Sequence, residues 1–171
     1  MSRKKKAKIE EGPWNKDKAV GQMAPFTPAQ AGVIRSLLTA EKKIRDLALF
    51  NMALDTMLRA SDLLPLRVID ITDQNGDVVQ EFNIKQKKTG RQLTREQYAN
   101  LVKRWSSLAR LDPKRHSTHS MRRSKSAAIY DATQNLAACQ HLLGHKSIGS
   151  TAHYLGVDQR KALDLAKRIK L

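Results

Sequence analysis

The residues best suited to chemistry in this chain lie between His119 and Tyr154. His119 and Arg122 are three positions apart, and His145 follows a Leu-Gly pair nine residues before Tyr154. A guanidinium group matches the geometry of phosphate oxygens, a histidine can transfer a proton near neutral pH, and a tyrosine can act as a covalent nucleophile. Together these residue types can hold a phosphate and attack it with a phenolic oxygen.

The charge of the chain indicates a polyanionic partner. The net charge is +16 and the isoelectric point is about 10.3. Most of the excess lies in residues 85–125, which contain thirteen Lys or Arg against two Asp or Glu. Such a block favours binding along nucleic-acid phosphates, because each neutralised phosphate releases counterions. A solvated surface that only keeps the protein soluble is the alternative.

Length and cysteine content limit the class of protein. A chain of 171 residues can form one domain with a buried core. Cys139 is the only cysteine, so an intramolecular disulfide is excluded and a reducing, cytoplasmic location is expected. No apolar run approaches the ~20 residues of a membrane span, which predicts that the protein has no membrane partner.

The sequence contains no motif typical of a metal site or a nucleotide-binding site. It lacks the carboxylate cluster of two-metal catalysis and the glycine-rich Walker A loop. His116, His141 and His153 are spaced unlike zinc ligands, and no role is assigned to them. We therefore expect no cofactor and no metal.

Local signals predict where the supporting elements begin and end. Residues 1–26 combine a lysine cluster with Gly and Pro and are expected to form a flexible basic arm, followed by one domain over residues 27–171. The sequences TPAQ at 27–30 and TREQ at 94–97 have the form of helix caps. Helices are predicted from Thr27, over 41–56 and 61–64, from Thr94 toward Pro113, over 120–131, over 135–143 with Gly144 as C-cap, over 150–155, and from Asp158 to the end.

A small sheet is predicted between the short helix at 61–64 and the helix that begins at Thr94. The run RVIDI at 67–71, a turn at 73–76 and alternating apolar residues over 78–84 have the pattern of a β-hairpin. Lys88 then lies in a second turn, at 87–90. The expected fold is mainly α with a small antiparallel β-sheet.

Five short motifs occur in a characteristic order: LRASDL around Arg59, KKTG at 87–90, HSMR at 119–122, LLGH at 142–145 and HYLGV at 153–157. In this order they resemble the tyrosine recombinase (phage integrase) family. The resemblance covers most of residues 27–171 and implies the fold of the family's catalytic domain. It also implies site-specific cutting and rejoining of DNA in a phage or another mobile element.

The resemblance assigns the central chemistry to three residues. Tyr154 would attack the scissile phosphorus, which leaves a 3′-phosphotyrosyl link and a free 5′-hydroxyl. Arg59 and Arg122 would bind the non-bridging oxygens as negative charge accumulates. Because the phosphotyrosyl ester keeps the bond energy, a second 5′-hydroxyl could reverse the attack and join a new strand.

Three further residues receive supporting roles from the same resemblance. Lys88 would protonate the departing 5′-oxygen, His119 would assist removal of the tyrosine proton, and His145 would hydrogen-bond the phosphate. Structural interpretations exist as well, since Tyr154 could be an aromatic anchor and Arg59 could pair with Asp62. For the resemblance to be accidental, these structural interpretations would all have to be true at the same time, for residues that happen to follow the order of the family's motifs.

The expected partners are double-stranded DNA and further copies of this chain. We expect Lys87, Arg91, Arg123 and Lys125 to contact DNA, and we expect a homo-oligomer on DNA, with a tetramer on paired sites. A basic RNA-binding protein is a third hypothesis, but it leaves the ordered motifs unexplained.

Two departures from the family pattern favour an alternative function. Only about 26 residues precede the catalytic-type domain, and Lys88 and His119 are only 31 positions apart. The segment between them looks shortened relative to the family, and a small hairpin with few partner strands is marginal in water. The alternative is a catalytically weak or inactive DNA-binding derivative that regulates recombination sites.

Overall fold

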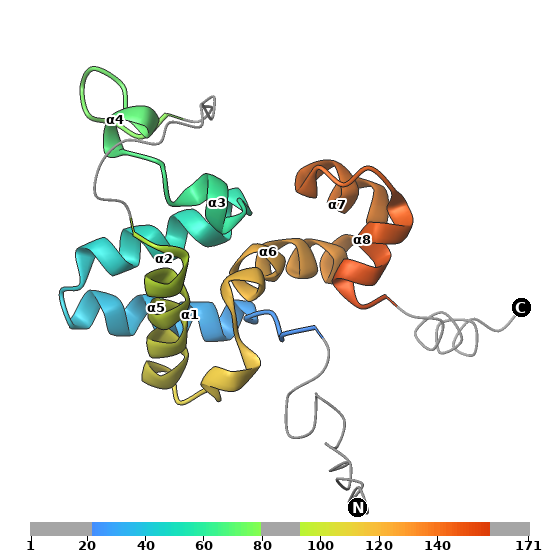
Figure 1. The fold of residues 1–171 in the computed structure, drawn as a ribbon, viewed down its shortest axis with the longest axis horizontal. Helices are drawn as coiled ribbons and strands as arrows, with labels where there is room; N and C mark the ends of the chain where they lie inside the picture. Colours follow the sequence, from blue (N-terminus) through green and yellow to red (C-terminus); the bar gives the residue numbers. More distant parts are fainter. Residues whose placement is uncertain (1–21, 80–92, 158–171) are drawn as a thin grey trace, which may run out of the picture.

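The computed structural model describes residues 22–79 and 93–157. These residues form helices joined by short connections (Figure 1). In chain order the helices are α1 (Pro28–Ala40), α2 (Ile44–Thr56), α3 (Ala60–Leu63), α4 (Val68–Ile71), α5 (Arg95–Leu108), a 3-10 turn (Pro113–Arg115), α6 (Thr118–Thr133), α7 (Leu136–Leu143) and α8 (Ile148–Leu155).

Capping residues fix the starts of α1 and α5, as predicted. The Thr27 hydroxyl accepts a hydrogen bond from the Gln30 amide at 3.2 Å, while the Gln30 side chain accepts one from the Thr27 amide at 2.9 Å. Thr94 and Gln97 repeat this reciprocal pair at the start of α5. Each pair satisfies two backbone donors that a helix start otherwise leaves without partners.

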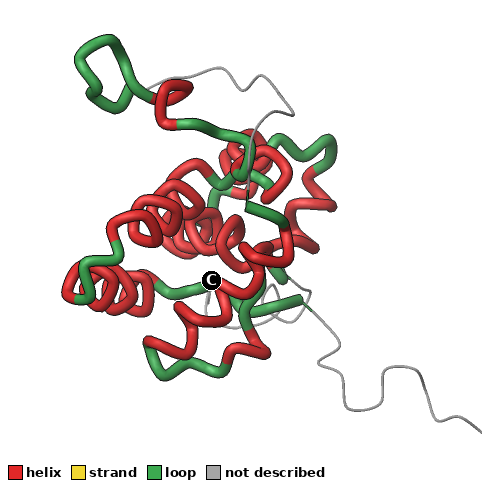
Figure 2. The backbone as a smooth tube through the Cα atoms, turned by 60° about the vertical axis from the view of Figure 1, so that its left-hand side comes forward, coloured by secondary structure: helices red, strands yellow, loops and turns green. Residues whose placement is uncertain are grey.

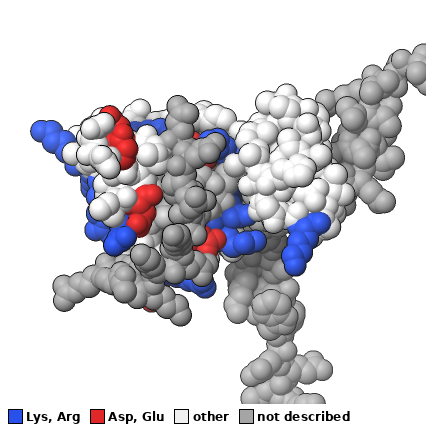
Figure 3. Space-filling view, turned by 90° about the horizontal axis from the view of Figure 1, so that it is seen from above, with Lys and Arg blue, Asp and Glu red and all other residues white. Residues whose placement is uncertain are grey.

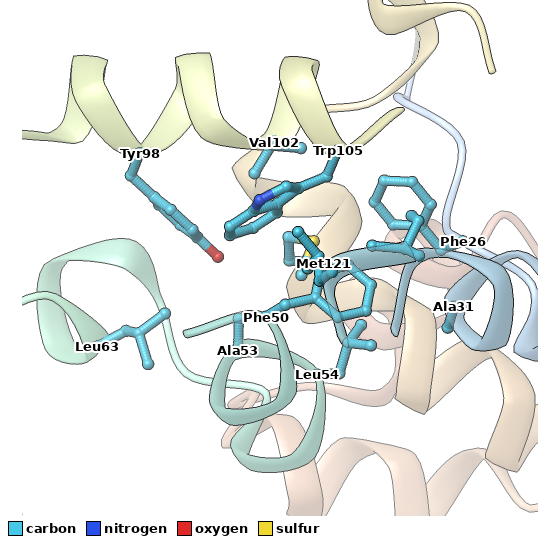
Figure 4. Packing of buried hydrophobic residues seen from close by; sticks show 12 residues of the cluster. Phe26, Ala31, Phe50, Ala53, Leu54, Leu63, Tyr98, Val102, Trp105 and Met121 are labelled. Carbon is cyan, nitrogen blue, oxygen red and sulfur yellow. The ribbon is translucent and has the colours of Figure 1, made fainter. Parts of the chain in front are cut away.

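The core forms where α5 packs against α1 and α3 and close to α2 (Figure 4). Trp105 is 1% exposed, and its ring meets the Phe50 ring edge-on with centroids 5.4 Å apart. The indole Nε1 also donates a hydrogen bond to Asp46 at 3.2 Å. An aromatic ring of this size supplies a large buried area, and the polar contact satisfies its one donor. We call α1, α2, α3 and α5 the body.

Helix α6 connects the body to a second group of helices. It packs on α2 and α5 of the body and also on α7 and α8 (Figure 1). We call residues 135–157, which contain α7 and α8, the lobe. Gly144 ends α7 in the left-handed conformation with φ of 62°, which confirms the predicted C-cap.

The predicted β-hairpin is wrong in its first half. Residues Val68–Ile71 form one turn of helix, because the Asp70 carboxylate accepts hydrogen bonds from the Arg67 amide and guanidinium. The turn that follows does bring Thr72 and Val78 together as a single antiparallel bridge. No strand occurs in the described residues (Figure 2). Residues 80–92, which carry the rest of the predicted hairpin and Lys88, lie outside the described residues.

Charge is unevenly distributed between the body and the lobe. Lys146 is the only Lys, Arg, Asp or Glu in the lobe. On the face shown in Figure 3 the lobe is almost wholly uncharged, whereas side chains of both signs mark the body. Within the described part of the chain, no helix has the length and apolar character needed to cross a membrane.

Candidate active site

Three of the predicted site residues line one pocket. Arg59, His119 and Arg122 form its walls together with Ala60, Ser61, Arg95 and Thr118. The pocket has a volume of about 190 Å³. Three guanidinium groups around a space of this size make a binding site for an anion such as a phosphate.

Helix starts bring these residues together. Arg59 is the extended residue just before α3, while His119 and Arg122 lie in the first two turns of α6. Backbone N–H groups at the start of a long helix such as α6 also favour an anion. The pocket therefore combines charged side chains with the positive end of α6.

Sequence reasoning missed Arg95. It is the first residue of α5, directly after the Thr94 cap, and it lines the same pocket as Arg59 and Arg122. A signal was present, because a cation at the N-terminus of a helix is unfavourable toward the helix dipole. Such a placement is better explained by an anionic ligand than by helix stability.

Arg122 is held firmly inside the protein. Its side chain is 7% exposed, and Nη2 donates a hydrogen bond to the Leu143 carbonyl at 2.5 Å. Burial lowers the pKa of Arg122, the Tyr154 hydroxyl opposes this effect, and the cation of Arg59 lowers the pKa further. An arginine retains its charge in this setting, so the pocket holds a fixed positive group.

Tyr154 lies beside this pocket. Its hydroxyl donates a hydrogen bond to the His119 carbonyl at 3.5 Å. Burial raises the pKa of Tyr154, whereas Arg122 lowers it through its charge and a hydrogen bond, and Arg123 and Arg59 lower it through their charges. The surrounding cations therefore favour the phenolate that burial disfavours.

His145 contacts Tyr154 directly from the loop before α8. The two rings meet edge to face with centroids 5.1 Å apart, and His145 Nδ1 lies 3.1 Å from the Thr151 hydroxyl. Burial, followed by the charges of Arg122 and Arg59, lowers the pKa of His145. These effects favour the neutral imidazole. The Thr151 hydroxyl, which sequence reasoning missed, orients the ring.

The residues predicted to contact DNA have different surroundings. Lys87, Lys88 and Arg91 lie outside the described residues. Lys125 is partly exposed, and its ammonium group contacts the Asp55 carbonyl at 3.1 Å and the Asp55 carboxylate at 3.3 Å. Arg123 is 5% exposed and faces the protein interior, a placement that sequence reasoning did not anticipate.

Of the three histidines without an assigned role, His116 is structural. Its ring stacks on Phe26 at 4.2 Å, and Nδ1 donates to the Ala24 carbonyl at 3.1 Å. His141 and His153 are exposed. Among the described residues, no group of three or more His, Cys, Asp or Glu is placed to hold a metal ion.

Comparisons with known proteins agree with this geometry. The sequence model of the phage integrase family matches residues 79–161. Tyrosine recombinase XerD of Xanthomonas campestris pv. campestris is 39% identical over 64 residues, which cover 37% of this chain and 20% of that protein. The probable integrase/recombinase YoeC of Bacillus subtilis is 25% identical over 150 residues, with coverage of 69% of this chain and 81% of the relative.

Solved structures share the fold. The XerH site-specific recombinase bound to its difH substrate superposes with a TM-score of 0.60 and 16% identity, over 88% of this chain and 56% of XerH. The Tn1549 transposon integrase in complex with a circular intermediate DNA gives a TM-score of 0.56 and 18% identity, over 90% of this chain and 68% of the integrase. These matches support a tyrosine recombinase (phage integrase) catalytic domain in this chain, and the match to XerD spans about a fifth of that relative.

Proposed function

We propose that this chain cuts and rejoins double-stranded DNA at specific sites, with Tyr154 as the nucleophile. The observation that carries the proposal is the arrangement of Arg59, His119 and Arg122 around one pocket, with Tyr154 hydrogen-bonded beside it. The relatives named XerD and YoeC and the DNA-bound neighbours support the same class of substrate.

In the proposed step, the scissile phosphate occupies the pocket and the Tyr154 oxygen attacks phosphorus. The bond between phosphorus and the 5′-oxygen breaks, and a 3′-phosphotyrosyl ester forms. The tyrosine proton leaves with help from His119, and Lys88 supplies a proton to the 5′-oxygen. Arg59 and Arg122 stabilise the charge on the non-bridging oxygens. Attack by a second 5′-hydroxyl reverses these bond changes and joins the strands.

Arg95 is assigned to the same phosphate pocket. It brings a third guanidinium to a wall already lined by Arg59 and Arg122. Since it is exposed, it can bind either the scissile phosphate or the next one along the strand. Its variant Arg95→Ala is expected to lower both DNA affinity and the rate of cleavage.

The alternative function is that of a DNA-binding derivative without strand-transfer activity, which regulates recombination sites. The observation in its favour is the short connection of 31 positions between Lys88 and His119. If Lys88 were displaced from the site, the departing 5′-oxygen would lack its proton donor. Misplacement of a catalytic group by ~1 Å can lower a rate ~100-fold.

One experiment separates the two functions. Nicked suicide substrates carrying candidate attachment sites trap the covalent intermediate, because the short fragment with the new 5′-hydroxyl diffuses away. We expect wild type to form an adduct on a denaturing gel and Tyr154→Phe to form none while binding the same DNA. DNA binding by wild type without any adduct on a verified site would favour the alternative, a DNA-binding derivative without strand-transfer activity.

We further propose assembly on DNA as a homo-oligomer, with a tetramer on paired sites. The apolar residues of the segment 158–171, which lies outside the described residues, recur at near-helical spacing. Deletion of this segment tests the proposal. If the shortened protein still folds but no longer binds paired sites cooperatively, the result would support docking of this segment on a neighbouring subunit. If the shortened protein does not fold, the segment stabilises its own domain.

A further inference from the structure

We propose that Arg123 is a positioning residue for Tyr154 and acts together with Gln22. This inference rests on the proposed function, since it concerns the same nucleophile. Arg123 directly follows Arg122 in the chain but faces away from the phosphate pocket, whose lining does not include it. Burial lowers its pKa, so the protein accepts an electrostatic cost to keep this cation inside.

Arg123 holds the backbone of the nucleophile. Its Nη1 donates a hydrogen bond to the Tyr154 carbonyl at 3.2 Å. That carbonyl lies in the last turn of α8, where helix carbonyls lack partners within the helix. A cation at this end of a helix is also favoured by the helix dipole. The contact therefore ties the C-terminal end of α8 to α6.

Arg123 also contacts the ring of the same tyrosine. The guanidinium carbon lies 5.7 Å from the centroid of the Tyr154 ring, within the range of a cation–π interaction. One side chain thus touches both the backbone and the ring of Tyr154. In this arrangement the Arg123 Nε is buried and has no hydrogen-bond partner among the described residues. A side chain placed only for stability would be expected to satisfy that donor.

Gln22 completes the arrangement from a distant part of the sequence. Its side-chain oxygen accepts a hydrogen bond from Arg123, and its side-chain nitrogen donates one to the His153 carbonyl. Residues 22–26 run along α6, where the Phe26 amide donates to the Ser124 hydroxyl at 2.8 Å. The segment before α1 therefore takes part in holding the helix that carries Tyr154.

The test compares Arg123→Met with Arg45→Met. The second variant makes the same chemical change at an exposed position of α2, outside residues 85–125, which hold most of the excess positive charge. Three quantities are measured: DNA affinity, the single-turnover rate of adduct formation at saturating DNA, and hydrogen exchange of the lobe amides in the free protein. Hydrogen exchange needs no activity, so it remains informative if wild type forms no adduct and the proposed function fails.

We expect both variants to lose DNA affinity by the same factor. Arg123→Met alone should slow adduct formation at least about tenfold, shift its pH profile upward because a cation near Tyr154 is lost, and speed exchange in residues 148–157. Arg123→Lys should recover part of the rate, since it restores a cation that can reach the helix end.

Two outcomes would overturn the inference. Unchanged exchange across α8 in a folded Arg123→Met protein would show that the side chain does not hold the helix. A larger loss of affinity than in Arg45→Met, with a normal rate at saturating DNA, would identify a DNA contact instead. If Arg123→Met does not fold, Gln22→Ala decides the question. It should speed exchange at the end of α8 and slow adduct formation, and no change in either would reject the role.

Discussion

The His145 ring stands almost perpendicular to the Tyr154 ring, at 89° with centroids 5.1 Å apart. The Thr151 hydroxyl fixes this arrangement, because it lies 3.1 Å from His145 Nδ1 and is itself fully buried. With Nδ1 engaged in this way, Nε2 is the nitrogen that we expect to meet a phosphate oxygen. One threonine hydroxyl thereby orients the imidazole ring that touches Tyr154, the proposed nucleophile.

Replacement of Thr151 tests this orientation. We expect Thr151→Val to keep the fold and DNA affinity but to slow adduct formation about tenfold to hundredfold, because the imidazole loses the group that holds it. Single-turnover cleavage of a suicide substrate measures the effect. Thr151→Ser retains the hydroxyl and serves as the control. Equal rates in the valine variant and wild type would mean that His145 does not need this partner.

Arg122→Ala should damage both activity and stability. Loss of charge stabilisation at the phosphate predicts a rate about 10²–10³-fold lower. The Leu143 carbonyl would lose its buried donor, at a cost of roughly 1–3 kcal/mol in the free energy of unfolding. Adduct assays and urea titration measure the two effects. Arg122→Lys keeps the charge and should recover more stability than rate, and a full recovery of rate would argue against bidentate phosphate binding.

The salt dependence of DNA binding should reveal which basic residues face phosphates. Each lost phosphate contact lowers the slope of log affinity against log salt by about 0.9. We expect Lys87→Ala with Arg91→Ala to flatten the slope. Lys125→Ala should change it less, because its ammonium group is engaged by Asp55. A larger change from Lys125→Ala would show that DNA displaces the Asp55 contact.

Stability should fall in mild acid because of His116. Burial lowers its pKa, the charge of Arg115 acts in the same direction, and the Ala24 hydrogen bond and Asp112 oppose them. A histidine with a lowered folded-state pKa stabilises the fold above its unfolded pKa of about 6.5 and loses that contribution as pH falls. His116→Gln should be less stable at pH 7 and show a flatter stability curve between pH 7 and 5, as measured by urea unfolding. An unchanged curve would assign the acid sensitivity to other groups.

Local signals predicted much of the helical fold, and the motifs named Arg59, His119 and Arg122, which the structure places around one pocket. The caps at Thr27, Thr94 and Gly144 depend on neighbouring residues, so the sequence alone located them. The first half of the predicted hairpin was wrong because the Arg67–Asp70 pair stabilises a helical turn in a segment rich in β-branched residues. Apolar alternation carries no information about such a side-chain contact.

Long-range contacts were beyond sequence reasoning. Nothing near Arg123 indicates that its guanidinium would meet Gln22, 101 positions earlier. The adjacent Arg122 and Arg123 look equivalent in sequence, yet successive residues on a helix point in different directions. Only the packing of α8 on α6 decides that one of them lines the pocket and the other contacts Tyr154 from the inside.

The position of α6 between the body and the lobe has a consequence for heat resistance. Arg59 belongs to the body, whereas His145 and Tyr154 belong to the lobe, and the lobe packs mainly on α6. Local opening of a small unit requires less free energy than global unfolding. Warming should therefore separate Tyr154, the proposed nucleophile, from the pocket while the aromatic core around Trp105 is still intact, so that the proposed strand cleavage should cease several degrees before the protein melts.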